Sequence, residues 1–338
     1  MDLNTIWFVL IGVLIIGYAI LDGFDLGVGV LHLFTHDSQE RRLYLNAIGP
    51  VWDGNEVWLL TGGGALFAAF PMVYATVFSG FYLAIMLLLV ALIFRAVSLE
   101  FRGKVDSERW RRIWDWAFGL GSLLPAMLFG IAIGNIVRGV PIDAAGRWAG
   151  SFPGLLNPYA ILIGVFSLIL FTMHGAIYLT LKTEGALRER MIVWASGSWI
   201  AMVVLYFLAT LATIFVSPFL FEGMVRNPLF WVLFILLLVS LLTIPAFLKA
   251  ARHVRAFLAS SLAIACIIGL SAVSLFPRLV PSSIDLAYSL TITNASSSQT
   301  TLATMLIIAL IGMPLVIGYT IFIYRAFKGK VVLTSDSY

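Results

Sequence analysis

Residues 5–33 read TIWFVLIGVLIIGYAILDGFDLGVGVLHL, an apolar run that carries two carboxylates, Asp22 and Asp25. Their spacing of three residues puts both on the same face of a helix. A carboxylate held at membrane depth costs about 2.5–3.5 kcal/mol on insertion scales, so acids in such a position indicate a function. The run therefore predicts a membrane-spanning helix that contributes to a polar site inside the membrane.

A second motif, GPVWDGNEVW at positions 49–58, repeats this pattern, because Asp53 and Glu56 are again three residues apart and apolar sequence follows. The pair Gly49-Pro50 precedes the two acids. Proline removes a backbone donor and clashes with the preceding helical turn, so we expect a kink or a partial unwinding there. A distorted helix would leave room for buried polar side chains.

The composition is that of a membrane protein. Apolar residues make up 61% and charged residues 11% of the 338 residues, and the mean hydropathy is +1.01, far outside the soluble range. We expect an all-α integral membrane protein, a bundle of nine transmembrane helices in a single polytopic domain over residues 1–338. Each expected span has the about 20 apolar residues that crossing a membrane needs, and the spans are about 5–33, 43–70, 72–99, 114–137, 155–182, 190–216, 228–248, 255–276 and 302–327.

Lys and Arg predict the orientation of these spans. With a periplasmic N-terminus, 16 of the 21 basic residues fall in cytoplasmic connections or at the C-terminus, and four fall on the other side. Because cytoplasmic loops carry an excess of Lys and Arg, this division favours a periplasmic N-terminus and a cytoplasmic C-terminus. The net charge of +4 then reflects topology, and we expect no nucleic-acid partner.

Ionisable residues continue from the two motifs toward the cytoplasmic surface. Asp25 lies eleven residues before His36 and Asp53 eleven residues after Arg42, which is about 17 Å of helical rise in each case, so both acids lie near mid-membrane. Such a series suits proton or ion movement, whereas a hydrogen-bonded cluster that fixes helix register is the alternative. For Arg95 the alternatives are a counter-ion or a snorkelling side chain. The proton-relay candidates are Asp22, Asp25, Asp53, Glu56, Arg95, Glu100, Lys104 and Asp115.

No metal site is expected in this chain. His32 and His36 have the i, i+4 spacing of helix metal sites, but no third ligand is evident, and a polar cap at the helix end is the preferred interpretation. His174 lies deep in a span, where it could ligate haem or be a neutral, hydrogen-bonded imidazole; the second interpretation is preferred. The single cysteine, Cys266, excludes a disulfide framework.

Aromatic residues beside the second motif raise a different possibility. Trp52 and Trp58 flank Asp53 and could line a slot for a quinone or a lipid. Aromatic side chains in apolar spans more often serve packing, and this remains the alternative.

Eight short motifs run in order along essentially the whole chain: DGFDxGVG from 22, WDGNxVWL from 52, GGALFAAFPMVY from 63, FSGFY from 78, FR at 94, WRxxWDW from 110, PSS at 281 and SSQxTL from 297. Together they resemble subunit II of the cytochrome bd family of quinol oxidases. The region from about 138 to 260 matches only in its pattern of spans.

The resemblance implies nine helices and a heterodimer with a subunit I that carries haem b and haem d. It implies a respiratory complex that oxidises quinol and reduces oxygen to water in the cytoplasmic (inner) membrane of a bacterium or archaeon, among membrane lipids. Small single-span accessory subunits are a further partner class. In this family subunit II holds no haem of its own and supports assembly and proton delivery.

The resemblance also implies roles for particular residues. Asp53, Glu100 and Lys104 fall on a cytoplasm-to-haem proton route proposed in the family. Some relatives hold a quinone near the Trp52–Asp53 region, so the cofactor-binding candidates for a quinone or a lipid are Trp52, Asp53 and Trp58. Asp53 would be the central carrier, with proton uptake at Glu100 and Lys104. Asp25 and Glu56 would be neighbouring members and Arg95 the electrostatic tuner. Glu100 stands where relatives can have a shorter aspartate.

Two other classes of function stay open from the residues alone. A purely structural partner subunit would use the buried acids only to fix helix register. A proton-coupled secondary transporter would use them for ion coupling, but the internal repeats that are typical of such proteins are not visible in the sequence.

Overall fold

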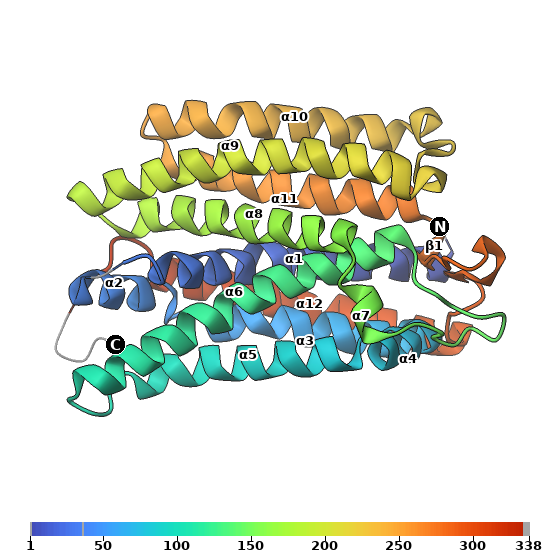
Figure 1. The fold of residues 1–338 in the computed structure, drawn as a ribbon, viewed down its shortest axis with the longest axis horizontal. Coiled ribbons are helices and arrows are strands. Elements are labelled where there is room, and N and C mark those ends of the chain that lie inside the picture. Colours follow the sequence, from blue (N-terminus) through green and yellow to red (C-terminus); the bar gives the residue numbers. More distant parts are fainter. Residues whose placement is uncertain (1, 36, 334–338) are drawn as a thin grey trace.

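The computed structural model describes residues 2–35 and 37–333. These residues form a bundle of helices whose long axes run side by side (Figure 1). The α-helices are α1 (Leu3–His32), α2 (Ser38–Ile48), α3 (Trp52–Ala69), α4 (Pro71–Gly80), α5 (Tyr82–Phe101), α6 (Glu108–Arg138), α7 (Phe152–Leu155), α8 (Pro158–Lys182), α9 (Gly185–Val216), α10 (Pro228–Lys249), α11 (His253–Leu275) and α12 (Gln299–Ala326). The shorter elements are the 3₁₀ helices η1 (Pro218–Phe221), η2 (Met224–Arg226) and η3 (Leu286–Tyr288), and the strands β1 (Arg278–Val280) and β2 (Leu290–Thr291).

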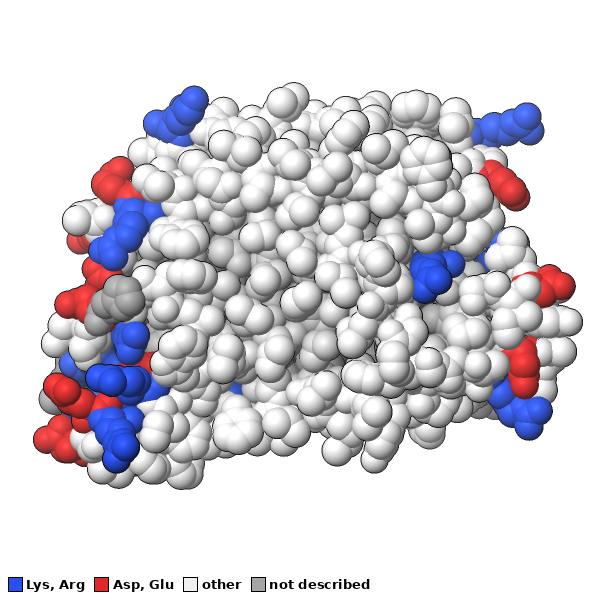
Figure 2. All heavy atoms as spheres, viewed as in Figure 1, with Lys and Arg blue, Asp and Glu red and all other residues white. Residues whose placement is uncertain are grey.

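Charged side chains gather at the two ends of the bundle and leave a broad, almost uncharged belt between them (Figure 2). Eight of the described helices are long and apolar enough to cross a membrane, namely α1, α5, α6, α8, α9, α10, α11 and α12. A belt of this kind is the surface that lipid tails require. The chain is therefore an all-α, multi-pass membrane protein.

The count of nine expected spans is not reproduced within the described residues. The expected span 43–70 is divided into α2 and α3, and α3 has only 18 residues and is not among the eight spanning candidates. The division falls at Gly49-Pro50, where proline disfavours a continuous helix. The expected span 72–99 is likewise divided into α4 and α5, which meet at Phe81.

Helix α1 lies inside the bundle and contacts α3, α6, α8 and α11. Small residues allow the closest of these approaches, since a Cβ built on Gly27 would overlap the carbonyl oxygen of Phe171 on α8. Gly23 also faces the Phe171 ring, as the Gly-x-x-x-Gly spacing predicts. This packing buries the acidic half of α1, so Asp22 and Asp25 lie in the core.

The segment that follows α11 is an ordered cap on the opposite end of the bundle from α2 (Figure 1). Strands β1 and β2 pair antiparallel, and Val140 forms a bridge with Ser282. The Trp7 indole N–H donates to the carbonyl oxygen of Leu302 at 2.9 Å, which ties α1 to α12 beside this cap.

Candidate functional site

Arg95 and Asp22 form an ion pair in the core of the bundle. Arg95 of α5 donates from Nη1 to Asp22 Oδ2 at 2.9 Å and from Nη2 to Asp22 Oδ1 at 2.5 Å. Both side chains are fully buried. A two-pronged guanidinium–carboxylate pair has a fixed geometry, so Arg95 is directed to the acids of α1 and not to the membrane surface.

Asp25 is connected to α3 and α12 through Asn55. The Asn55 amide donates to Asp25 Oδ2 at 2.7 Å and to the carbonyl oxygen of Leu21 at 3.1 Å. The Tyr324 hydroxyl in turn donates to Asn55 Oδ1 at 2.9 Å. Asp25 Oδ2 also lies 3.9 Å from Arg95 Nη2. Asp25 Oδ1 is buried without a hydrogen-bond partner among the described residues, so this carboxylate keeps capacity to accept a proton.

Two members of this network, Asn55 and Tyr324, were not among the site residues predicted from the sequence. Asn55 lies between Asp53 and Glu56 in the second motif, and a polar amide at that position was an available signal. Tyr324 lies near the end of an otherwise apolar helix, 269 residues from Asn55. The sequence around Tyr324 gives no sign that this residue is close to the acids. The connection arises only from the packing of α12 beside α3.

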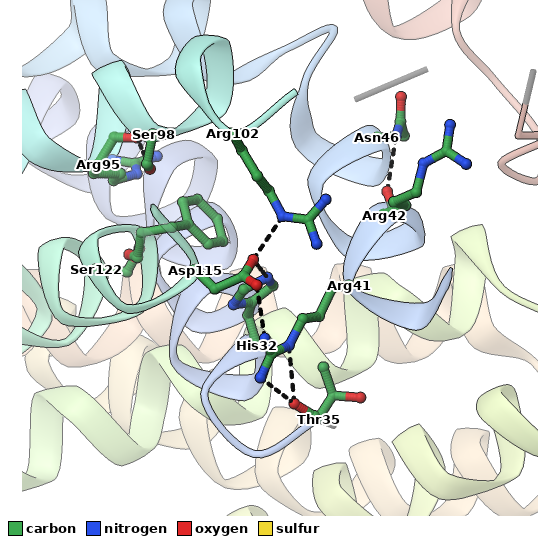
Figure 3. Close-up of polar contacts among 11 residues, drawn as sticks. His32, Thr35, Arg41, Arg42, Asn46, Arg95, Ser98, Arg102, Asp115 and Ser122 are labelled. Carbon is green, nitrogen blue, oxygen red and sulfur yellow. Dashed lines mark hydrogen bonds and ion pairs between the residues drawn. The ribbon is translucent and has the colours of Figure 1, made fainter. Parts of the chain in front are cut away.

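Asp115 forms a second ionic cluster at the α2 end of the bundle, the end that the basic residues predict to be cytoplasmic. Figure 3 shows Asp115 between Arg102 and Arg41, above His32. Asp115 accepts from Arg102 Nε and from Arg41 Nη1, each at 2.6 Å, and His32 Nε2 lies 3.2 Å from Asp115 Oδ1. Arg41 also donates to the carbonyl oxygen of Thr35. The cluster ties together the ends of α1, α2, α5 and α6.

His32 is not the simple polar cap that the sequence suggested. Its side chain is only 1% exposed and contacts Asp115, and its ring meets the Phe118 ring edge to face at 5.1 Å. The expectation was wrong because α6 covers this end of α1, which the position of His32 in its own helix does not reveal. His36 lies outside the described residues.

The acids of α3 lie on the outside of the bundle. Asp53 is exposed and Glu56 is half-buried, and Glu100 and Lys104 are exposed at the end of α5 and just after it. The eight relay candidates are thus divided into three groups. Asp22, Asp25 and Arg95 lie together in the core, and Asp115 belongs to the second cluster. Asp53, Glu100 and Lys104 are exposed at the surface of this chain, and the half-buried Glu56 lies between this surface and the core group.

The two tryptophans of the second motif contact protein. A Cβ built on Gly17 of α1 would overlap the Trp58 ring, so this indole packs over Gly17. Trp52 is half-buried and packs against the main apolar core. Each indole ring is therefore covered in part by this chain's own side chains or backbone. That the two tryptophans bind a quinone or a lipid stays a prediction.

His174 is buried with both ring nitrogens engaged by protein groups. Its Nε2 lies 3.1 Å from the carbonyl oxygen of Ile20 and its Nδ1 2.7 Å from the hydroxyl of Ser260. A carbonyl only accepts, so Nε2 carries the proton and the ring is oriented by both neighbours. The ring also stacks on Phe257 at 4.8 Å. This is the hydrogen-bonded imidazole that the sequence interpretation preferred.

Metal and haem ligation depend on how the His, Cys, Asp and Glu side chains of the described part of the chain are grouped and on which of their atoms are engaged. No three His, Cys, Asp or Glu side chains within it are grouped so as to hold a metal ion. Because the nitrogens of His174 are already engaged, this residue would have to give up its hydrogen bonds before it could ligate haem iron.

Comparison with known proteins identifies the family. The family model described as cytochrome bd terminal oxidase subunit II matches residues 3–327. The chain belongs to this family. The resemblance seen in the motifs is therefore confirmed.

Individual relatives agree over nearly their whole length. The chain is 39% identical to the cytochrome bd-I ubiquinol oxidase subunit 2 of Escherichia coli K12, over 97% of this chain and 95% of that one. It is also 39% identical to the cytochrome bd ubiquinol oxidase subunit 2 of Bacillus subtilis, over 98% and 97%. These relatives are bacterial and give no support to the archaeal alternative. Membership places the chain among the subunits of respiratory bd-type quinol oxidases.

A solved structure has the same fold. The bd oxidase from Geobacillus thermodenitrificans matches with a TM-score of 0.81, over 97% of this chain and 99% of that one. The identity in this comparison is 19%, so the likeness concerns the fold alone.

Proposed function

We propose that this chain is the subunit of a bd-type quinol:oxygen oxidoreductase that pairs with a haem-bearing subunit I and delivers cytoplasmic protons for reduction of oxygen to water. In this proposal the chain is one polytopic domain in a bacterial inner membrane, with its N-terminus in the periplasm and its C-terminus in the cytoplasm. The observation that carries the proposal is the position of Asp53, which is exposed on α3 beside the half-buried Glu56, while Asn55 between them bonds the buried Asp25.

The outward acids support a partner surface along α3. A lipid-facing carboxylate at membrane depth is costly, so polar groups there are ordinarily covered by protein or by a water-filled cavity. Helix α12, which contacts α3, is exposed along nearly its whole length. Covering α3 and α12 with subunit I would shield Asp53 and Glu56 from lipid and bring them close to groups of the partner.

The proton route follows from this arrangement. Glu100 and Lys104 would take up protons at the cytoplasmic end of α5, and Asp53 would carry them along the interface with Glu56 as its neighbour. Asp25 would act as an inner member, since one of its oxygens has no partner. Arg95 would act as the electrostatic tuner, because its positive charge stabilises the ionised form of the neighbouring acids. Asp22 and Asp115 are each held by arginine, so we assign them to positioning instead of transfer.

The cofactors belong to the partner in this proposal. Haem b and haem d would be bound by subunit I, and membership of the subunit II family supports this assignment. A quinone beside Trp52 and Trp58, and small single-span accessory subunits, remain compatible with the outward face of α3.

The substitution Asp53→Asn tests the relay. Asparagine keeps the size and the hydrogen bonding of aspartate but removes its exchangeable proton, so assembly should survive while proton transfer should not. We expect an assembled complex with normal haem content that has lost most of its quinol oxidase turnover. Glu100→Gln should be milder, because bulk water is close to its position.

The matched control is Glu189→Gln. Glu189 is an exposed acid on α9, at the same end of the bundle as Glu100. Helix α9 lies far from α5 in Figure 1, so Glu189 is outside the proposed proton route. It should keep parental turnover. If the assembled Asp53→Asn complex turned over at the parental rate, the relay role would be lost and the acids would have a structural role only.

That structural role is the second candidate function. It is favoured by the bidentate pair of Arg95 with Asp22 and by the cluster around Asp115, both of which tie helices together. A transporter would instead move ions in the absence of subunit I, and transport by the isolated chain in vesicles would identify it.

A further inference from the structure

A pocket opens at the α2 end of the bundle, and within the described part of the chain it meets the acidic network only at Tyr324, which lines its inner wall. It lies between the end of α8, the start of α11 and the end of α12, and its volume is about 710 Å³. Tyr178, Phe257 and Tyr324 line its inner wall. The hydroxyl of Tyr178 donates to the carbonyl oxygen of Ala47 and that of Tyr324 to Asn55, so neither hydroxyl proton is directed at a ligand in the pocket.

The residues around this pocket carry one sign of charge. No Asp or Glu is among the described residues that line it, whereas six of them are cationic or titratable nitrogen bases, namely Lys182, Arg252, His253, Arg255, Lys328 and Lys330. A concave surface lined by a single charge attracts the opposite charge strongly.

The lysines of the pocket are fixed by neutral groups. Lys182 Nζ donates to the carbonyl oxygen of Phe327 at 2.7 Å, and Lys330 Nζ donates to that of Thr180 at 3.1 Å. These bonds hold the two ammonium groups at the pocket without neutralising them. Burial, followed by repulsion from the nearby Arg188, lowers the pKa of Lys330 below its usual value, while Glu184 opposes this effect. Glu184 is itself paired with Arg188, and neither Glu184 nor Glu189, the acid that acts on His253, lines the pocket.

The start of α11 adds to this field. A tight turn leads from α10 into α11, with Ala251 in the left-handed region at φ +53°. Arg252 occupies the N-cap position and no side chain caps the helix. The first N–H groups of a helix favour an anion. The His253 Nδ1 atom, on a residue that lines the same pocket, is buried without a hydrogen-bond partner among the described residues.

An apolar track leads away from the charged residues. Val254 lines the pocket, and Leu258 and Leu262 follow it at intervals of four residues, so the three share one face of α11. They are 62%, 61% and 40% exposed. The track therefore runs from the charged end of the bundle into the uncharged belt, as an acyl chain attached to an anionic headgroup would.

We propose that this pocket binds the phosphate headgroup of an anionic phospholipid from the adjacent leaflet, with an acyl chain lying along Val254, Leu258 and Leu262. The basic residues and the uncapped start of α11 would hold the phosphate. The apolar track makes a lipid the better occupant than a soluble phosphate, because a soluble anion would use the basic residues alone. The inference adds a ligand site to the proposed function and does not depend on the proton route.

The test uses the purified complex of this chain with its partner subunit. The double variant Arg252→Gln/Arg255→Gln removes two exposed charges of the pocket. The matched control, Arg109→Gln/Arg112→Gln, removes two exposed charges with the same spacing at the start of α6 and the same end of the bundle. Each complex is equilibrated with phosphatidylglycerol, delipidated stepwise, and assayed by native mass spectrometry for retained lipid.

We expect the parental complex and the control to retain one more phosphatidylglycerol than the pocket variant, with an apparent affinity about tenfold weaker in that variant. Equal retention by the pocket variant and the control would overturn the proposal. So would equal retention of phosphatidylcholine by the parental complex, since the site would then not select charge. Displacement of the lipid by millimolar inorganic phosphate would also overturn it and indicate a soluble anion as the occupant.

Discussion

Arg95 and Asp22 are 73 residues apart in the chain and face each other as a fully buried, bidentate ion pair. The pair joins α5 to α1 in the core of the bundle. The Nη2 atom of Arg95 also lies 3.9 Å from Asp25 Oδ2. A charge buried in this way is compensated only while its partner is present. The effects of substituting the two residues on the stability of the complex should therefore be strongly coupled.

Arg95→Gln should therefore destabilise the assembled complex by about 3–5 kcal/mol, because it leaves Asp22 as an uncompensated buried charge. The double variant Arg95→Gln/Asp22→Asn removes both charges and should recover much of this loss. Thermal inactivation of the complex, followed through its haem absorbance, measures both effects. Additive losses in the double variant would show that the two residues act independently.

The cluster around Asp115 should behave differently from an exposed ion pair. Asp115→Asn would leave Arg41 and Arg102 facing each other without their shared carboxylate, so we expect a loss of about 3–5 kcal/mol. The control is Asp106→Asn, whose pair with Arg111 is largely exposed and is worth about 0–1 kcal/mol. Thermal inactivation should separate the two variants, and similar stability would contradict the role of the cluster in tying the helix ends together.

Gly27→Ala should prevent α1 and α8 from packing, because its Cβ would overlap the carbonyl oxygen of Phe171. The overlap involves backbone on both sides, which a change of rotamer cannot relieve. The control is Gly12→Ala on the same helix, whose Cβ would meet no other atom within 4 Å. The yield of assembled complex should fall sharply for Gly27→Ala alone. Normal yield of that variant would disprove the close approach.

His174→Ala should leave the haem spectrum of the complex intact, since both ring nitrogens bond to protein groups. We expect a moderate loss of thermal stability, because Ser260 and the Ile20 carbonyl lose a buried partner. The absorbance spectrum of the assembled variant is the measurement. Disappearance of one haem band with both subunits still present would identify His174 as a ligand.

Much of the architecture follows from local sequence. Apolar runs long enough to cross a membrane specify the class of protein, and the pair Gly49-Pro50 specifies the break between α2 and α3, since proline acts on its own turn. The family also follows from the motifs. The count of nine spans is not confirmed, because α3, with 18 residues and three polar side chains in its first turns, is not among the eight described helices that are long and apolar enough to cross a membrane.

Whether each pair of acids faces the core or the surface was decided by the tertiary structure. The i, i+3 spacing puts Asp22 with Asp25, and Asp53 with Glu56, on common faces, but the spacing is the same in both motifs. Packing of α6 and α8 against α1 turns the first pair into the core, while α3 keeps an exposed face on which Asp53 lies. The sequence by itself determined which residues could act together along one helix. Only the tertiary structure decided their partners from distant helices, such as Arg95, Asn55 and Tyr324, because those contacts depend on how whole helices pack.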